Sequence, residues 1–434
     1  MRCLTISITI FLNLVVFGIC SYMYLLWSQY WIYSGKQSES TTSTYDQQIY
    51  LYNRGYLPDD TKNKSNLVKT RSKHEIRENI VYINNSRPRF PSSGQKNIEL
   101  DAKQFSCLKN DSRLECENKT RLIKEKILRE LGNVFFEQSH VLKYGARNNT
   151  YNVHYVGPKE NYRDKRPQQV LCELMNTKLE TLKRGDIDSS ETIKSSMPKR
   201  GFFENKYFNS CVVVASSGAL EGSNLGTFID SHDIVLRFNH APIKGFEQDV
   251  GKKTSIRVLN SQVATKAQYN FLKSAIFKNV TIVIWDPANY SATLEEWMRH
   301  SEFNFFPNFI QYRKQEERPR IFMVNPLTIW DLWDFMQRNF PKRLRKNPPS
   351  SGFLGLRLLL PHCNFVDVVE YIPSARVTKR CHYYDPDNNP ACTFGVWHPL
   401  AAEKLLTYHL NSASDFDVFQ KGFARIKGFK HLKC

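Results

Sequence analysis

Two histidines near the carboxyl end of the sequence stand in settings that could support acid–base chemistry. His398 precedes Pro399, which suits the first position of a helix and would make His398 its N-cap. The positive end of such a helix favours a neutral imidazole, and a neutral imidazole can act as a general base. Glu403 would lie in the first turns of the same helix. His382 opens the sequence His382-Tyr-Tyr-Asp385; for either histidine taken singly, a structural role remains an alternative.

Small polar residues follow three predicted strands and could bind a nucleotide or a sugar. Ser216 ends an apolar run, and its small side chain would let a ligand approach the backbone. Asn239 and Asn260 each end a later strand, and an amide can both donate and accept, as recognition of ribose, cytosine or a carboxylate requires. Each motif alone is equally compatible with an ordinary turn.

A second anion-binding candidate is the sequence Ser350-Ser351-Gly352, which precedes an apolar helix. Free backbone N–H groups, two hydroxyls and the helix dipole together suit a phosphate or a carboxylate. Ordinary helix capping by serine is the alternative interpretation.

Several other classes of site are not supported. The sequence has no Gly-x-Ser-x-Gly, no P-loop, no Gly-x-Gly-x-x-Gly and no Cys-x-x-Cys. Pairs of aspartates spaced Asp-x-Asp begin at Asp186, Asp385 and Asp415, but they stand in polar or aromatic contexts rather than after an apolar strand. We therefore expect no metal site.

Strands that alternate with helices must position these residues. Apolar runs predict strands over 211–215, 234–238, 256–259, 280–285 and 320–324, with helices over 326–340 and 351–360 between or after them. This alternation predicts an α/β fold with a largely parallel sheet, in which ligands bind at the carboxyl ends of the strands. A further amphipathic helix is expected over 120–131, with Gly132 as its stop.

The amino-terminal region predicts a membrane anchor and a stem. No charged residue occurs between Cys3 and Gly35, and the run is long enough for one membrane-spanning helix. We expect a cytosolic tail over 1–4, a signal anchor over 5–27 and a polar lumenal stem over 28–165. A cleavable signal peptide ending near Cys20 is the alternative.

Composition narrows the class of protein further. With 28 Phe and 21 Tyr in 434 residues, the chain can build a folded core. Its net charge of +19 favours an acidic partner. The tightest basic clusters are 163–166 and 342–346; without a run of six like charges we expect no nucleic-acid binding. Sequons that permit N-glycosylation occur at Asn63, Asn84, Asn110, Asn118, Asn148, Asn279 and Asn289.

Taken together, the motifs resemble those of the eukaryotic sialyltransferase family and, within it, the β-galactoside α-2,6-sialyltransferases. The large sialyl motif corresponds to residues 211–255, the small motif to 349–367, the third motif to 382–385 and the very small motif to 398–403. The resemblance covers residues 172–434. The α-2,6 assignment rests on Asn260-Ser-Gln262 and three other short sequences, 285–287, 304–306 and 348–352.

The resemblance implies a Rossmann-like variant of the GT-A type, with a single catalytic domain over 166–434 after the anchor and stem. It implies CMP-sialic acid as the donor, no metal or other cofactor, and a type II protein of the Golgi membrane, and it is compatible with a homodimer. The acceptor would be the 6-hydroxyl of a terminal galactose, in Galβ1-4GlcNAc on glycoprotein glycans. The implied disulfides are Cys211–Cys363, Cys172–Cys434 and Cys381–Cys392, which leaves Cys107 and Cys116 as a pair.

The resemblance also implies a role for each site residue in an inverting transfer. His398 would be the general base, and His382 would stabilise or protonate the departing phosphate. Tyr383 and Glu403 would support the site. The donor would be held by Ser216, Asn239, Asn260, Ser350, Ser351 and Gly352.

The acceptor side departs from the family pattern. Glu302 and Phe303 stand where relatives have Asp-Tyr, Trp397 replaces Tyr, and Asp385 replaces Gln, while Gln262 is retained. A GalNAcβ1-4GlcNAc acceptor or another linkage such as α-2,3 therefore remains an alternative. An inactive glycan-binding protein of the Golgi membrane is the alternative from another class.

Overall fold

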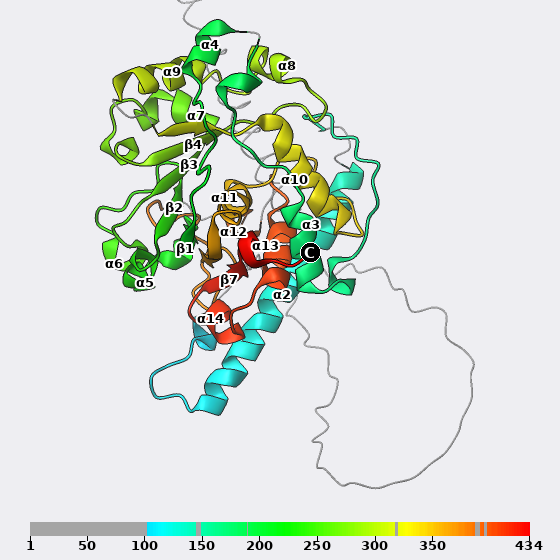
Figure 1. Ribbon diagram of the computed structural model, residues 1–434. Helices are drawn as coiled ribbons and strands as arrows, with labels where there is room; N and C mark the ends of the chain where they lie inside the picture. The colour runs from blue at the N-terminus through cyan, green and yellow to red at the C-terminus, as the bar shows by residue number, and fades with distance from the viewer. Residues whose placement is uncertain (1–101, 145–148, 189, 317–319, 387–390, 395–396) are drawn as a thin grey trace, which may run out of the picture. The chain divides into compact units, whose positions relative to one another are not determined.

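The computed structural model describes residues 102–144, 149–188, 190–316, 320–386, 391–394 and 397–434 (Figure 1). The expected tail and anchor, with the sequons at Asn63, Asn84 and Asn148, lie outside the described residues. The described residues belong to one unit, 94–434. None of the helices within the described ranges has both the length and the apolar character that crossing a membrane requires.

A sheet of seven strands forms the centre of the described structure. Its strands are β1 (Phe208–Val214), β2 (Ile234–Phe238), β3 (Ile256–Asn260), β4 (Thr281–Trp285), β5 (Ile321–Met323), β6 (Cys363–Val369) and β7 (Phe423–Lys427). Their order is β5-β4-β3-β2-β1-β6-β7; β7 pairs antiparallel with β6, and all other pairs are parallel. The α/β fold predicted from the sequence is confirmed.

The order of the strands places a switch point between β1 and β6. From β1 the chain adds strands in one direction as far as β5, then returns to add β6 on the other side of β1. At such a point the connections leave the sheet in opposite directions, which opens a crevice at the carboxyl ends of the strands. The residues that follow β1 and β6 are therefore placed to bind a ligand.

Helices cover both faces of the sheet (Figure 1). They are α2 (Arg113–Tyr144), α3 (Pro167–Met175), α4 (Glu191–Ser196), α5 (Gly226–Asp230), α6 (Glu247–Val250), α7 (Ser261–Thr265), α8 (Leu294–Arg299), α9 (Phe306–Gln315), α10 (Pro326–Arg338), α11 (Ser351–Leu359), α12 (Ala391–Phe394), α13 (Leu400–Leu410) and α14 (Asp415–Phe419). Successive side chains of a strand point to opposite faces of the sheet. Val213 packs in the core with α11 and α13, while Val212 and Val214 pack with α5 and α6.

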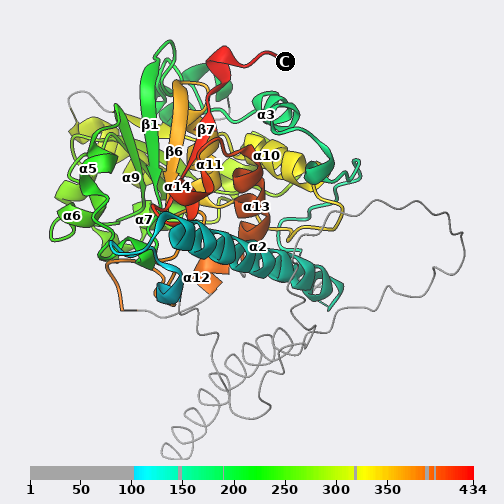
Figure 2. The same cartoon turned by 90° about the horizontal axis from the view of Figure 1, so that it is seen from below.

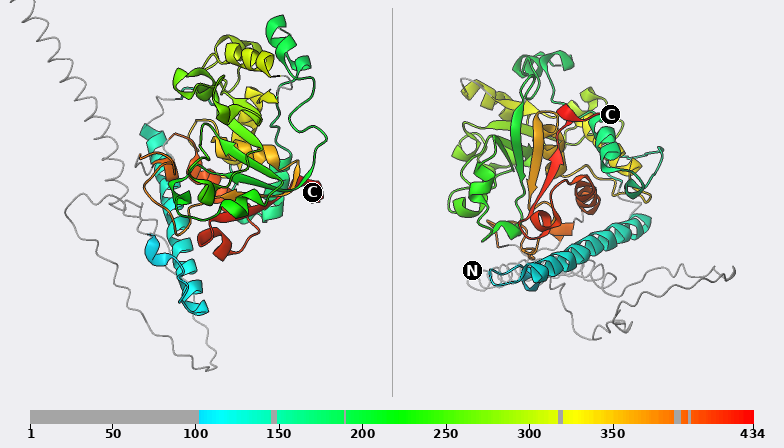
Figure 3. Two further views of the ribbon diagram at one scale, coloured as in Figure 1. Left: turned by 90° about the vertical axis from the view of Figure 1, so that its left-hand side faces the viewer. Right: turned by 60° about the horizontal axis from the view of Figure 1, so that its bottom comes forward.

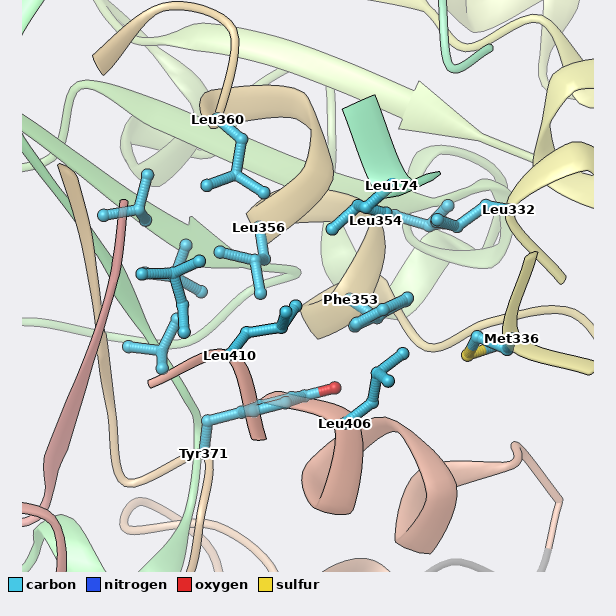
Figure 4. Close-up of a cluster of buried hydrophobic side chains, with 14 of the residues drawn as sticks. Leu174, Leu332, Met336, Phe353, Leu354, Leu356, Leu360, Tyr371, Leu406 and Leu410 are labelled. Atoms are coloured by element: carbon cyan, nitrogen blue, oxygen red, sulfur yellow. The ribbon is translucent and has the colours of Figure 1, made fainter. Parts of the chain in front are cut away.

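The largest core lies around α11. Phe353, Leu354 and Leu356 of this helix are almost fully buried. Phe353 and Leu356 lie toward Leu406 and Leu410 of α13, whereas Leu354 lies toward Leu174 and Leu332 (Figure 4). Gly355 allows α11 to approach the sheet closely, since a Cβ there would lie 3.0 Å from the ring of Phe238 in β2. The helix that carries Ser350 at its start is thus fixed against both the sheet and α13.

Helix α2 corrects two sequence-based expectations. The predicted helix over 120–131 exists but extends over 113–144, so Gly132 does not end it. Ile123, Ile127 and Leu131 are fully buried, and α2 packs against α13 and α14 (Figures 2 and 3). This tertiary packing allows the helix to continue past Gly132, because one glycine in a helix interior lowers helix stability by only about 1 kcal/mol.

Part of the segment expected to be stem is therefore folded. Besides α2, Tyr151 and Val153 are buried in the main core, and the Tyr162 ring packs against that of Phe340 in a tilted arrangement, with centroids 5.0 Å apart. The described residues between 102 and 165 therefore belong to the same compact unit as the catalytic motifs, so the predicted stem over 28–165 includes folded residues.

Four disulfides lie within this unit, and two of them, Cys172–Cys434 and Cys211–Cys363, join parts that are distant in the sequence. Three are the pairs that the resemblance implies, Cys172–Cys434, Cys211–Cys363 and Cys381–Cys392, and the fourth is Cys107–Cys116. Cys211 and Cys363 lie on the neighbouring strands β1 and β6, so their bond joins the two sides of the switch point.

Candidate active site

The loops at the carboxyl ends of β2 and β3 bring two of the predicted nucleotide-side residues, Asn239 and Asn260, into contact. Asn239 has a left-handed backbone (φ 48°), and its Oδ1 accepts a hydrogen bond of 3.1 Å from the backbone N–H of Asn260. Asn260 in turn caps α7 through Val263 N–H, at 3.3 Å. Since both side-chain oxygens are used in this way, the amide N–H groups are what the two asparagines can offer a ligand.

Ser216 meets the segment that carries His382. Its carbonyl accepts a hydrogen bond of 3.2 Å from Tyr383 N–H, and Ser217 forms a β-bridge with His382. The Tyr383 hydroxyl donates to the carbonyl of Pro242 beyond β2. Tyr383 therefore holds the His382 segment across the ends of β1 and β2, which is a supporting role.

The imidazole of His382 is oriented by two neighbours. Its Nδ1 lies 2.5 Å from Oδ2 of Asp385, and its ring stacks on Tyr384 with centroids 5.1 Å apart and an interplanar angle of 9°. A carboxylate at this distance accepts a hydrogen bond from Nδ1 and fixes the orientation of the ring. We expected Asp385 on the acceptor side, but the structure places its carboxylate beside His382.

The start of α11 is held by a buried carboxylate. Glu403 Oε1 accepts from Ser350 N–H at 2.8 Å, and Oε2 accepts from the hydroxyls of Ser350 at 2.5 Å and Tyr371 at 2.6 Å. The Tyr371 ring reaches from the end of β6 toward α13 (Figure 4). Burial raises the pKa of Glu403, which the three donors oppose. The Ser350 proton is thus directed at Glu403, so Ser350 shapes the helix start rather than presenting a free hydroxyl donor.

Ser351 and Gly352 complete this helix start. Ser351 Oγ accepts a hydrogen bond of 2.9 Å from the indole N–H of Trp285, at the end of β4. A Cβ on Gly352 would lie 2.6 Å from the Tyr371 ring, so this position excludes any side chain. The backbone N–H groups at the N-terminus of α11 remain the anion-binding feature of the motif.

His398 is present as a neutral base. Its Nδ1 lies 2.8 Å from the carbonyl oxygen of Pro348, which can only accept, so Nδ1 carries the proton and Nε2 keeps its lone pair. Among the described residues, nothing bonds to Nε2. Burial lowers the pKa of His398 to about 4. The helix begins at Leu400 with Pro399 as its N-cap, so His398 precedes the cap by one residue and the predicted N-cap position was wrong.

The acceptor-side residues divide into two groups. Trp397 lies against His398, with centroids 4.3 Å apart, and near Tyr151, whose hydroxyl donates to Glu302 Oε2 at 3.0 Å. Gln262 and Phe303 instead share Lys266, which donates to the Gln262 amide oxygen at 2.9 Å and lies 5.4 Å from the Phe303 ring centroid.

A cleft of about 630 Å³ opens beside the first group. Tyr151, His154, Trp297 and Glu302 are among its lining residues. Sequence reasoning missed Tyr151, because it lies in a segment expected to be stem. It also missed Asp286, which is fully buried and accepts from Trp297 Nε1 at 2.9 Å and from Glu302 N–H at 3.0 Å, and so fixes the cleft wall.

Two further sequence-based expectations concern metal and glycans. Across the described ranges, no group of three or more His, Cys, Asp or Glu is arranged to hold a metal ion. The sequons at Asn110, Asn118, Asn279 and Asn289 are exposed, and Asn289 lies at the edge of the cleft.

Comparison with known proteins gives a family match. The sequence model described as "Glycosyltransferase family 29 (sialyltransferase)" matches residues 161–414. The chain is 46% identical over 227 residues to "Beta-galactoside alpha-2,6-sialyltransferase 2" of Gallus gallus, covering 52% of this chain and 43% of that protein. It is 40% identical over 298 residues to the protein of the same name from Danio rerio, covering 68% and 57%.

A third relative and one solved structure complete the comparison. The chain is 42% identical over 224 residues to "Beta-galactoside alpha-2,6-sialyltransferase 1" of Homo sapiens, covering 52% of this chain and 55% of that protein. The chain thus spans about half the length of the curated relatives that it matches. A solved "Mammalian Sialyltransferase" aligns with a TM-score of 0.33 and 22% identity, covering 64% of this chain and 81% of that one.

Proposed function

Because the chain belongs to glycosyltransferase family 29, the sialyltransferases, we propose that it transfers sialic acid from CMP-sialic acid to the 6-hydroxyl of a terminal galactose, as in Galβ1-4GlcNAc. The names of the relatives support a β-galactoside acceptor and an α-2,6 linkage. The observation that carries the proposal is His398, a neutral imidazole with an unprotonated Nε2. It packs against Trp397, whose ring centroid lies 6.3 Å from that of Tyr151 in the cleft wall.

The proposed mechanism is an inverting displacement. His398 Nε2 removes the proton of the acceptor hydroxyl as its oxygen attacks the anomeric carbon of sialic acid. The bond from that carbon to the CMP phosphate breaks, and the electron pair leaves on the phosphate oxygen. His382, held by Asp385, donates a hydrogen bond or a proton to the departing phosphate. The N–H groups at the start of α11 hold an anionic group of the donor.

Substrate recognition follows from the two ends of the site. The amides of Asn239 and Asn260, with Ser216, face the nucleotide, because they follow neighbouring strands at the switch point. Glu302, Phe303 and Trp397 define the acceptor side together with Gln262. The reaction needs no metal in this proposal, since His382 and the α11 N-terminus supply the electrostatic stabilisation of the leaving group.

One assay tests the function. Purified protein is supplied with CMP-sialic acid and either Galβ1-4GlcNAc or GalNAcβ1-4GlcNAc, and the product linkage is read by NMR. We expect an α-2,6-linked product on galactose, unchanged by EDTA. The change His398→Ala should lower the rate by about 10²- to 10⁴-fold, the usual contribution of a positioned base. Normal activity of that variant would contradict the base assignment, and product only with GalNAc would reassign the acceptor.

The location of the protein is a separate proposal. An apolar segment over 5–27 and a polar segment after it support a type II Golgi membrane protein with a lumenal catalytic unit. Four disulfides in the described unit are consistent with a compartment that is oxidising. Protease protection of the catalytic unit in sealed Golgi vesicles tests the orientation, and digestion without detergent would contradict it.

A further inference from the structure

A second, smaller cleft adjoins the acceptor-side cleft and has no part in the transfer described above. Its volume is about 150 Å³, and it lies between the segment around Lys159 and the loop that holds Arg343 and Lys346. His154 lines both clefts, so they are neighbours on one surface. The loop belongs to the basic cluster 342–346 that the sequence singled out.

Within the described ranges, no acidic side chain forms a salt bridge with the three cations that line this small cleft, Lys159, Arg343 and Lys346. Arg343 adds to burial in lowering the pKa of Lys346. Nearby acids are engaged elsewhere: Glu160 pairs with Lys165 at 2.5 Å, and Asp334 accepts from the Tyr290 hydroxyl at 2.8 Å. The cleft therefore attracts an anion from outside the chain.

The backbone that carries these cations is fixed from the inside. Gln337 of α10 is 2% exposed; its amide donates to Lys342 O at 2.9 Å and accepts from Leu344 N–H at 2.9 Å. Trp333 of the same helix donates to Arg345 O at 2.9 Å. On the opposite wall, Glu160 N–H donates to Arg338 O at 2.7 Å. Two walls anchored to one helix thus fix the backbone from which Lys159, Arg343 and Lys346 extend, which an ordinary solvated charge run does not need.

We propose that this cationic cleft binds carboxylates of acidic side chains on the polypeptide that carries the acceptor glycan. The proposal rests on the proposed function, because it assumes that an acceptor occupies the adjoining cleft. The small volume suits one or two side chains rather than a larger ligand. Guanidinium and ammonium groups that converge without acidic partners suit carboxylates.

The kinetic test uses two glycopeptides with the same galactose-terminated glycan, one flanked by Asp and Glu and the other by Asn and Gln. In the triple variant Lys159→Gln, Arg343→Gln, Lys346→Gln, we expect KM for the acidic glycopeptide to rise about five- to tenfold with kcat unchanged, since such charges act on encounter and binding. KM for the neutral glycopeptide should stay the same. The matched control is Lys199→Gln, Arg200→Gln, Lys252→Gln, which removes three exposed cations that make no salt bridge among the described residues.

Three outcomes would overturn the proposal. The first is an equal KM for the acidic glycopeptide in the wild-type protein and the cleft variant. The second, measured with an added neutral glycopeptide whose glycan already bears one sialic acid, is a KM increase confined to that substrate, which would identify a glycan carboxylate as the occupant. The third is an equal effect of the control variant, which would show that general surface charge is responsible.

A binding measurement separates this proposal from the proposed function. Fluorescence anisotropy of the labelled acidic glycopeptide without donor should show weaker binding to the cleft variant and a steep loss with added salt. If the cleft variant binds the acidic glycopeptide more weakly but the wild-type protein transfers sialic acid to no acceptor, only the proposed function is contradicted. Transfer to both acceptors with unchanged binding would contradict the cleft alone.

Discussion

At the scale of the residue, His398 has its protonation state set by its surroundings. The Pro348 carbonyl fixes the proton on Nδ1, and burial lowers the pKa to about 4. The imidazole is therefore in its basic form throughout the range in which an ordinary histidine, with a pKa near 6.5, would gain a proton.

This pKa predicts the acid limb of the reaction. Because kcat/KM reports groups of the free enzyme, the limb that belongs to His398 should fall near pH 4 rather than near 6.5. The same shift also affects the free energy of unfolding. Between pH 6.5 and 4, His398 binds a proton in the unfolded chain but not in the folded chain, so the free energy of unfolding falls as the pH falls through this range. A kcat/KM profile from pH 4 to 8 checks the first statement; a His398-dependent limb at pH 6 to 7 would contradict it.

Asp385 gives a second prediction at this scale. Asp385→Asn removes the charge 2.5 Å from His382 but keeps a similar shape. We expect kcat to fall about tenfold while KM for the acceptor is unchanged, because a carboxylate that orients a catalytic imidazole acts on the chemical step. Steady-state kinetics with varied acceptor measure both constants. A selective rise in acceptor KM would return Asp385 to the acceptor side.

At the scale of the element, α13 connects the two histidine segments. Lys404, buried on this helix, donates a hydrogen bond to the carbonyl of Thr393 in α12, and burial lowers its pKa to about 8. The neighbouring Cys392 is bonded to Cys381, which directly precedes His382. The helix that follows His398 thus also holds the turn tied to His382.

Lys404→Met should therefore lower activity without unfolding the protein. Methionine keeps most of the buried volume but cannot donate to Thr393, so α12 loses this contact. We expect kcat to fall several-fold while the apolar packing of α13 is kept, with a change in melting temperature of a few degrees, as about 1 kcal/mol for one hydrogen bond implies. Kinetics and calorimetry on the same samples check this. An unchanged kcat would show that α12 does not position His382.

Element types were predictable where the apolar pattern was simple. The five strands from β1 to β5 are apolar runs, and the sequence located each of them. It did not locate β6 as a strand, because β6 buries Asp367 in its middle. That carboxylate is matched by His232 at 3.0 Å and by Arg425 of β7 at 2.7 Å, partners that lie far away in the sequence. Such a strand is stabilised by tertiary pairing that local patterning does not reveal.

The candidate site was predictable in its motifs but not in its contacts. The sequence proposed both histidines and the α11 start, whereas the pairing of Ser350 with Glu403 and of Asp385 with His382 depends on how α11, α13 and the 382–385 segment pack together.

At the scale of the whole molecule, the folded unit is larger than the catalytic motifs. The solvent face of α2 is charged, and its surface pairs include Arg113 with Glu117 and Arg121 with Glu125, so the helix resembles a polar stem in composition. Its buried face nevertheless completes the core beside α13 and α14.

A truncation tests this boundary. Protein over 94–434 should unfold cooperatively, whereas protein over 166–434 should aggregate or melt at a much lower temperature. The shorter protein lacks Ile123, Ile127 and Leu131, so the surface of α13 that they cover becomes exposed. The loss of a buried side chain of this type typically lowers the free energy of unfolding by about 2–5 kcal/mol. Scanning calorimetry and size-exclusion chromatography compare the two. Equal melting temperatures would support 166 as the boundary.

The bond between Cys172 and Cys434 constrains the timing of synthesis. The two cysteines are 262 residues apart, and at ribosomal speeds of about 5–20 residues per second the first emerges roughly 13–50 s before the second. During that interval Cys172 is a thiol without its native partner while Cys211 and Cys363 become available to it. Native pairing therefore requires that Cys172 either stays reduced until Cys434 emerges or releases a non-native partner by thiol–disulfide exchange.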